Sequence, residues 1–245
     1  MKQIINKYVS LLLGKDYISK RAAKKASELL ANKGAEALDA YYSVADEMGV
    51  EFTPMFGTLL GAYREHGFIP HDDDIDMALD IKYLSDDLLL ALEKKGFELS
   101  DIYIASNFRG CQLPMKYKGL TCDIYFTYPD KNGQTHIWLP LAHGGHDWSH
   151  ASKMNIFRSK DVIIPKYDTF VKCNFLDKEI NIPSNTKEIL STLYGHSFMT
   201  PIKGAHADPK VYQAPIYEHF YSCYPLEFCK EHNLIEVLRT KGLEQ

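Results

Sequence analysis

The stretch MFGTLLGAYREHGFIPHDDDIDMAL, residues 55–79, holds the most informative pattern in this chain of 245 residues. At its acidic end, Asp74 and Asp76 flank Ile75. Successive side chains of a β-strand point to opposite faces, so the two carboxylates share one face while Ile75 and Met77 face a core. This arrangement predicts a clamp for a divalent cation.

A Gly-Thr turn at Gly57 and Thr58 precedes a predicted helix over residues 58–66. Backbone N–H groups at a helix N-terminus attract phosphate, and a glycine leaves room for a close approach. The turn therefore predicts a phosphate seat beside the clamp. Arg64, about two turns along the helix, is either a diphosphate clamp or a salt-bridge partner of the acidic run.

A third carboxylate stands in a second predicted strand, residues 121–127, where Asp123 alternates with Cys122 and Ile124. An Asp-x-Asp strand with a lone Asp on a neighbouring strand is a ligand set for Mg²⁺, with Mn²⁺ as the alternative. Asp123 is a metal ligand or the general base for an acceptor hydroxyl. Acidic runs are most often solvated loops, but the Gly-Thr turn and Asp123 together favour a site. Asp72, in phase with the pair, is the preferred additional ligand.

Composition describes a soluble globular protein, with 45% hydrophobic and 24% charged residues and a net charge of -4. No apolar run reaches the about 18 residues of a membrane span, and no signal peptide is evident, so we expect a cytoplasmic protein. The five cysteines are scattered without a C-x-x-C pair, which indicates free thiols. The acidic body and the missing recognition module argue against nucleic-acid binding.

Residues 1–34 carry eight basic side chains and two acidic ones, together with several large apolar residues. This composition fits peripheral contact with the inner face of an anionic membrane. The more common alternative is a helix packed on the body through its apolar stripe.

The chain alternates predicted helices and strands, followed by a largely antiparallel section. Helices are predicted over residues 2–14, 18–49 (with an interruption at Gly34), 58–66, 82–95, 185–194, 211–223 and 226–240. Strands are predicted over residues 52–56, 74–79, 97–99, 102–105, 113–117 and 121–127, with hairpins at 132–133 and 177–178. Asn185 and Glu188 fit a capping box. We divide the chain into a helical segment (1–50), a catalytic core (51–203) and a helical C-terminal segment (204–245), packed as one unit.

Residues 55–79 resemble the signature of the LicD/fukutin-related family, which is close to G-T-L-L-G-x-x-R-x-x-x-x-I-P-W-D-D-D-I-D. The likeness continues more weakly through MKYK, CDIYF and YGHSFMTP, so that it covers roughly residues 40–203. His71 stands where Trp is usual, and Phe198-Met199 replaces Tyr-Met.

The resemblance implies an α/β (α+β) fold, a nucleotidyltransferase-like mixed sheet flanked by helices. It also implies that Asp74 and Asp76 bind metal, that Asp123 completes the site, and that Gly57 and Thr58 contact the phosphates of the donor. Family members move a phospho-alcohol, such as phosphocholine, ribitol phosphate or glycerol phosphate, from a CDP-linked donor to a glycan or glycolipid. Lys116 is a candidate for charge compensation, with a surface lysine as the alternative.

The histidine-rich segment HGGHDWSH contains His143, His146 and His150. Its glycines make a regular helix improbable, so a zinc site is disfavoured against a surface loop or a loop at the substrate pocket. The predicted function is a metal-dependent phosphotransferase that releases CMP. The alternatives are a nucleotidyltransferase that uses a nucleoside triphosphate, and a catalytically silent glycan- or nucleotide-binding protein.

Overall fold

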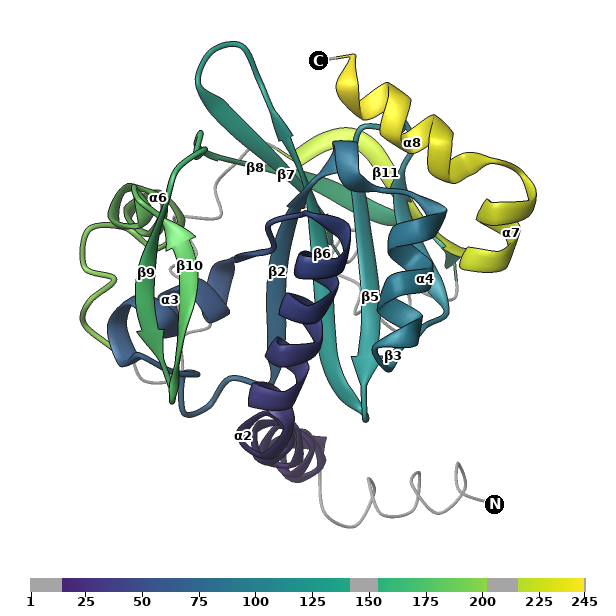
Figure 1. Ribbon diagram of the computed structural model, residues 1–245. Coiled ribbons are helices and arrows are strands. Elements are labelled where there is room, and N and C mark those ends of the chain that lie inside the picture. Colours follow the sequence, from purple (N-terminus) through teal and green to yellow (C-terminus); the bar gives the residue numbers. More distant parts are fainter. Residues whose placement is uncertain (1–14, 142–153, 202–215, 245) are drawn as a thin grey trace, which may run out of the picture.

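The computed structural model describes residues 15–141, 154–201 and 216–244 and shows the expected mixture of helices and strands (Figure 1). The helices are α2 (Lys15–Met48), α3 (Phe56–Glu65), the 3-10 turn η1 (Ile81–Tyr83), α4 (Asp86–Lys94), α6 (Thr186–Tyr194), α7 (Leu226–Glu231) and α8 (Leu234–Leu243). The strands are β1 (Thr53–Pro54), β2 (Asp74–Asp80), β3 (Phe97–Leu99), β4 (Asp101–Ala105), β5 (Cys111–Tyr117), β6 (Leu120–Pro129), β7 (Gln134–Leu141), β8 (Phe157–Pro165), β9 (Phe170–Phe175), β10 (Lys178–Pro183) and β11 (Ile216–Pro225).

Nine strands form one mixed sheet in the order β1-β2-β6-β7-β8-β11-β4-β5-β3. Among the described strands of this sheet, β2 and β6 alone pair in parallel, and the other neighbours are antiparallel. Strand β5 pairs with β6 as well as with β4, so the order from β6 round to β5 closes on itself. This closed, curled part of the sheet creates an inner side onto which β4, β5, β6 and β7 can all direct side chains.

Helix α2 packs across β2 and β6, with α4 beside it, and the hairpin β9–β10 and α6 lie next to α3 (Figure 1). The core between α2 and the sheet includes Leu38, Tyr41 and Ile75, all fully buried. Burial of such apolar side chains is the main stabilising contribution to the fold. It holds β2 and β6 rigidly at the centre of the molecule.

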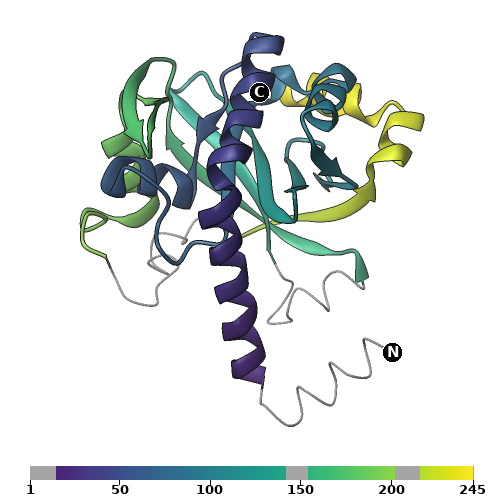
Figure 2. The ribbon, with the colours of Figure 1, turned by 60° about the horizontal axis from the view of Figure 1, so that its bottom comes forward.

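The first turns of α2 extend beyond the sheet (Figure 2). Here the basic residues Lys20, Arg21, Lys24 and Lys25 are exposed, and Leu30 is the first fully buried residue. This end of the helix is therefore not docked on the described body. Membrane contact by this segment stays a prediction, and the predicted helix at 2–14 lies outside the described residues.

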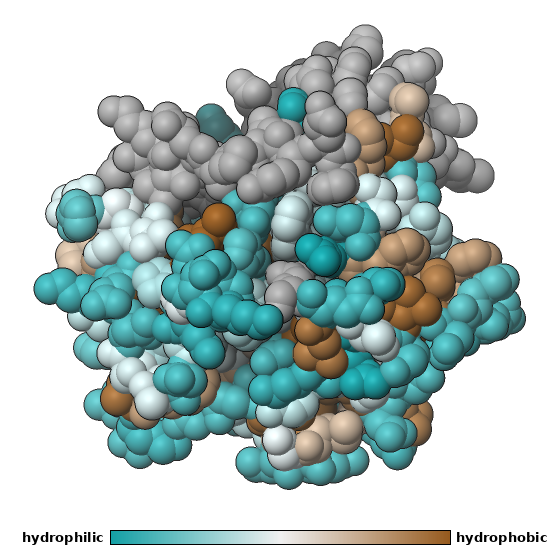
Figure 3. Space-filling model, turned by 90° about the horizontal axis from the view of Figure 1, so that it is seen from above, coloured by the Kyte–Doolittle hydropathy of each residue, from teal (hydrophilic) through white to brown (hydrophobic). Residues whose placement is uncertain are grey.

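The coloured part of the face seen in Figure 3 is mostly hydrophilic, with hydrophobic residues in small separate patches. Among the described helices, none combines the length and apolar character that crossing a membrane requires. The exposed large apolar residues, such as Val171 and Phe228, are distributed over several elements.

The predicted helix over 211–223 is wrong where the structure describes it, because residues 216–225 form β11. This strand pairs with β8 on one side and β4 on the other, and its tyrosines and phenylalanine suit a strand. The predicted helix over 226–240 is divided into α7 and α8 at Asn233, which has a left-handed backbone with φ of 54°.

Two local predictions also fail. Helix α2 runs through Gly34 without a break. The glycine leaves room for a neighbouring side chain, because a Cβ there would lie 2.4 Å from Cε2 of Phe68. Asn185 precedes α6 but makes no side-chain cap, since its Nδ2 donates to the carbonyl of Lys166 instead.

Candidate active site

The acidic strand and its neighbour bring three carboxylates together. Because β2 and β6 pair in parallel, Asp76 lies directly beside Asp123. Carboxylate oxygens of Asp74, Asp76 and Asp123 all lie within 4.8 Å of one another. Ile75 and Ile124, on the opposite face, are fully buried as the alternation predicted.

Asp72 belongs to the approach to β2 and not to the strand itself. Its carboxylate forms a second group with those of Asp73 and Asp74, again within 4.8 Å. Asp72 Oδ1 also accepts a hydrogen bond from the backbone N–H of Asp73 at 3.2 Å. Asp74 thus joins the two groups into one continuous acidic edge.

Helix α3 contacts the acidic edge through Gly57 and Thr58. Thr58 is 2% exposed, and its Oγ1 accepts a hydrogen bond from the backbone N–H of Asp76 at 3.0 Å. A Cβ at Gly57 would lie 2.4 Å from Oδ2 of Asp72, so a larger residue here would force the Asp72 carboxylate to move. In the structure, the pair positions the carboxylates, a role that the sequence reasoning did not assign to it.

The carboxylates repel one another and are shielded from water. Burial, followed by the charges of Asp72 and Asp73, raises the pKa of Asp74 to about 7. Burial and the charge of Asp74 raise the pKa of Asp76 well above its usual range. Burial raises the pKa of Asp123 to about 6, although Lys116 opposes this shift. Such a set has its charge balanced most directly by a bound cation.

Three neighbours of Asp123 shape its environment. Gln112 Nε2 donates to Asp123 Oδ2 at 3.3 Å, while Oδ1 is buried without a hydrogen-bond partner among the described residues. The Tyr125 hydroxyl lowers the pKa of both Asp76 and Asp123 by hydrogen bonding. Lys116 is exposed, and its Nζ donates to Thr121 Oγ1 at 2.6 Å. The free, buried Oδ1 and the oxygen-rich donor set fit a hard cation such as Mg²⁺.

Sequence reasoning did not identify Gln112 or Tyr125. Tyr125 could have been found, because the period of two that places Asp123 on one face places Tyr125 there too. Gln112 lies in β5 before the predicted start of that strand at residue 113. Only the pairing of Gln112 with Tyr125 across β5 and β6 reveals its position.

Arg64 lies away from the acidic edge in its described contacts. Its Nε donates to Glu65 at 2.7 Å, and Nη1 donates to the carbonyl oxygen of Phe198 at 3.0 Å. The salt bridge with the acidic run that the sequence allowed is not among the ion pairs of the described residues. In this structure Arg64 ties α3 to the segment that follows α6.

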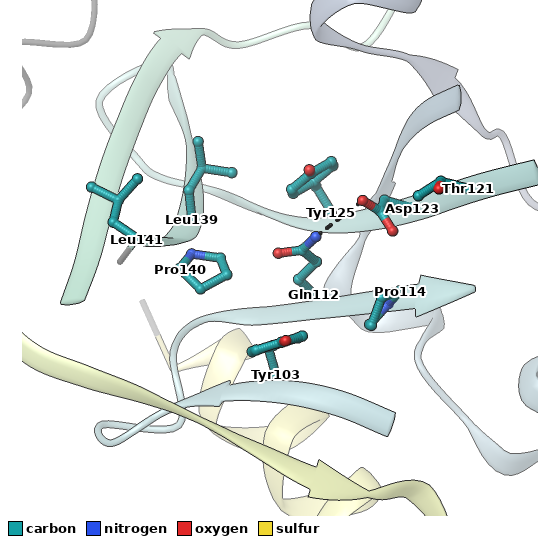
Figure 4. A pocket seen from close by; sticks show the side chains of 9 residues that line it. All are labelled: Tyr103, Gln112, Pro114, Thr121, Asp123, Tyr125, Leu139, Pro140 and Leu141. Carbon is teal, nitrogen blue, oxygen red and sulfur yellow. Dashed lines mark hydrogen bonds between the residues drawn. The ribbon is translucent and has the colours of Figure 1, made fainter. Parts of the chain in front are cut away.

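A cavity of about 300 Å³ opens beside Asp123 on the inner side of the curled sheet (Figure 4). Four strands contribute its lining, which consists of Tyr103, Gln112, Pro114, Thr121, Asp123, Tyr125, Leu139, Pro140 and Leu141. A space for a substrate group thus adjoins the carboxylates. The histidines His143, His146 and His150 lie outside the described residues.

The parallel Asp-x-Asp strand and lone Asp strand, preceded by a Gly-Thr helix start, bring together the three carboxylates that the sequence predicted to lie close. A family model described as "LicD/FKTN/FKRP, nucleotidyltransferase domain" matches residues 49–185. The chain belongs to this family. The matched range contains every site residue named above except Phe198.

Similar proteins include the ribitol-5-phosphate transferase FKTN of three mammals. The Mus musculus protein is 26% identical over 174 residues, which are 70% of this chain and 34% of the relative. The Macaca fascicularis protein is 24% identical over 171 residues (69% and 33%), and the Homo sapiens protein is 23% identical over 171 residues (69% and 33%). The chain thus matches about a third of the length of these relatives.

Proposed function

We propose that this protein is a divalent-cation-dependent phosphotransferase that moves a phospho-alcohol from a CDP-linked donor to a glycan hydroxyl and releases CMP. The observation that carries the proposal is the convergence of the Asp74, Asp76 and Asp123 carboxylates within 4.8 Å. Similarity to ribitol-5-phosphate transferases supports a phospho-alcohol as the transferred group.

Asp74 and Asp76 would hold the cation, with Asp72 at the edge of the set. When bound, Mg²⁺ or Mn²⁺ supplies charge neutralisation for the diphosphate of the donor. The start of α3, where Gly57 lies beside Asp72, offers backbone N–H groups of the kind that favour phosphate. Lys116 adds positive charge at the rim.

In the reaction, Asp123 accepts the proton of the acceptor hydroxyl. The acceptor oxygen attacks the phosphorus that carries the alcohol, and a new O–P bond forms as the P–O bond to CMP breaks. The electron pair of the broken bond leaves with CMP. Alignment of these groups by the rigid β2–β6 pair would provide much of the rate enhancement.

The description of the matching family model also supports a second candidate, a nucleotidyltransferase. Such an enzyme would attack the α-phosphorus of a nucleoside triphosphate and release pyrophosphate instead of CMP. The released product therefore separates the two functions.

The test is a donor panel of CDP-ribitol, CDP-glycerol and CDP-choline, incubated with the purified protein and Mg²⁺, with CTP in parallel. We expect slow CMP release by hydrolysis from at least one donor, its abolition by EDTA, and a rise in Tm when Mg²⁺ and donor are added together. Pyrophosphate release from CTP would support the nucleotidyltransferase. No product and no Mg²⁺-dependent change in Tm would overturn both and leave a non-catalytic binding protein.

A further inference from the structure

Phe56, the first residue of α3, has an unusual backbone for a buried aromatic residue. Its φ is 47°, in the left-handed region that side chains rarely adopt. Of the seven non-glycine residues with positive φ in the described part of the chain, Phe56 alone is buried and the other six are exposed. Such strain persists where the surrounding contacts hold it, and it is common at functional sites.

The residues on either side of Phe56 are hydrogen-bonded to the backbone of Asp76. The N–H of Met55 donates to the carbonyl oxygen of Asp76 at 3.0 Å, and the N–H of Asp76 donates to Thr58 Oγ1 at 3.0 Å. Between these two hydrogen bonds, the ring of Phe56 packs edge-on against Tyr125 of β6, with the ring centroids 5.0 Å apart and the planes at 80°. Phe56 thus links β2 to a side chain of β6.

Tyr125 contacts two of the three converging carboxylates. It follows Asp123 by two residues and lies beside it on β6, with Gln112 opposite on β5 (Figure 4). The Tyr125 hydroxyl hydrogen-bonds with the carboxylates of Asp76 and Asp123. A phenol has one proton, so the two carboxylates share a single donor. Oδ1 of Asp123 has no hydrogen-bond partner among the described residues, which leaves that oxygen available to a cation.

We propose that Phe56 and Tyr125 form a positioning pair, in which the strained Phe56 fixes the ring of Tyr125 and the Tyr125 hydroxyl orients two carboxylates toward one cation. These are the carboxylates of Asp76 and Asp123. The inference rests on the proposed function for the presence of the cation. It adds two residues that act through the carboxylates and not on the substrate.

Cation binding tests the pair without turnover. Mn²⁺ binding, followed by EPR, would be compared in the wild-type protein, Tyr125→Phe, Phe56→Leu and the double variant. Tyr125→Phe keeps the ring against which Phe56 packs and removes only the hydroxyl. We expect it to weaken Mn²⁺ binding by about 10–100-fold, as the loss of a hydrogen bond to a metal ligand typically does.

Phe56→Leu should weaken Mn²⁺ binding by a smaller factor. The double variant should bind within about twofold of Tyr125→Phe, because Phe56 acts through the hydroxyl that Tyr125→Phe already lacks. At saturating Mg²⁺, Tyr125→Phe should lower kcat for CMP release and leave the KM for the donor nearly unchanged, since a misplaced carboxylate affects the transition state.

Phe175→Leu is the matched control, because Phe175 is fully buried in a similar edge-on contact with Phe68, at 4.9 Å and 86°. It should lower the urea midpoint about as much as Phe56→Leu and leave Mn²⁺ binding within about twofold of wild type. Tyr125→Phe decides the matter if Phe56→Leu does not fold.

Mn²⁺ binding by Tyr125→Phe equal to that of wild type would overturn the proposal. A double variant whose loss of affinity is the product of the two single losses would overturn it as well, since the two residues would then act independently. A wild-type protein that binds no Mn²⁺ would contradict the cation site of the proposed function and, with it, this inference. The two failures are therefore distinguishable.

Discussion

Two clusters of acidic residues lie at different places along β6 and its neighbours, and their negative charges are balanced in different ways. In the first, Asp74, Asp76 and Asp123 converge, and the charge of the exposed Lys116 lowers the pKa of Asp123. In the second, His136 lies between two carboxylates, with Nδ1 at 2.7 Å from Asp161 and Nε2 at 3.8 Å from Asp130. The second cluster thus has a potential counter-charge between its carboxylates, whereas the cation beside the first is an exposed lysine.

The pKa directions follow this difference. Hydrogen bonds, first from the backbone N–H of Gln134, lower the pKa of Asp130, whereas burial and neighbouring carboxylates raise the pKa of Asp74 to about 7. Asp161 is intermediate, because burial raises its pKa while His136 opposes the shift. The second cluster has a histidine between its carboxylates, although Oδ1 of Asp161 is buried without a hydrogen-bond partner among the described residues. A cluster that keeps like charges together needs a ligand, and we therefore place function at the first.

The largest expected effect is on CMP release, and it should distinguish the first cluster from the second. Asp76→Asn should lower CMP release by about 10²–10³-fold or more, because it removes a cation ligand at the reacting phosphate. Asp130→Asn, at the surface turn of the second cluster, should leave CMP release within about twofold of wild type. In EDTA, Asp76→Asn should melt at or above the wild-type temperature, since it relieves repulsion. Near-normal turnover of Asp76→Asn would remove the distinction between the clusters.

The stability of the metal-free protein should depend on pH through the first cluster. Asp74 and Asp123 have folded-state pKa values of about 7 and about 6, against 3.8 for an unperturbed aspartate. Between pH 4 and 7 the folded state holds protons that the unfolded state has lost, so the free energy of unfolding falls as pH rises through this range. Tm in EDTA should drop by roughly a few degrees from pH 5 to 8.

Asp74→Asn should flatten this profile, and Asp130→Asn should not. Because the pKa of Asp130 is lowered, its contribution to the free energy of unfolding is lost only as pH falls toward and below that pKa, which is outside the measured range. A wild-type Tm that is constant from pH 5 to 8 in EDTA would contradict the electrostatic description of the first cluster.

The sequence predicted the first cluster better than the fold around it. Alternation placed Asp74 and Asp76 on one face and drew attention to Asp123 in a second predicted strand, and the family likeness agreed that Asp123 completes the site. The parallel register that sets Asp76 beside Asp123 is a long-range pairing, and local patterns do not contain it. Strand β11 was missed for the same reason, since its partners β8 and β4 are distant in sequence.

Roles within the site were also only partly predictable. The assignment of Gly57 and Thr58 to the donor phosphates stays a prediction. In the structure Gly57 faces the Asp72 carboxylate, and Thr58 accepts a hydrogen bond from the backbone N–H of Asp76. A motif indicates which residues meet, but the partner of a single side chain depends on how the helix and the strand pack. The position of Gln112 likewise depends on how β5 pairs with β6.

Replacing Thr58 should have a smaller effect, a loss of stability where α3 supports the first cluster. Thr58→Val keeps the shape of the side chain but leaves the buried N–H of Asp76 without its acceptor, at a cost of about 1–3 kcal/mol in the free energy of unfolding. Thr58→Ser keeps the oxygen and should recover most of the loss. Urea denaturation of both variants measures the free energy of unfolding, and an assay of CMP release measures their activity. Equal stability of the Val and Ser variants would show that the bond does not hold β2 in place.

Lys116 should give the smallest effect, because its side chain is exposed and its attraction to the carboxylates is screened by water. Lys116→Met removes the one cation whose charge lowers the pKa of both Asp74 and Asp123. The acidic edge then becomes more negative, so half-maximal activity should need less Mg²⁺ while the KM for the donor rises, each by roughly two- to fivefold. Lys172→Met, an exposed lysine of β9, is the matched control and should change neither. An unchanged Mg²⁺ requirement in Lys116→Met would mean that this lysine lies too far into solvent to act on the cluster, leaving the carboxylates to depend on the bound cation alone.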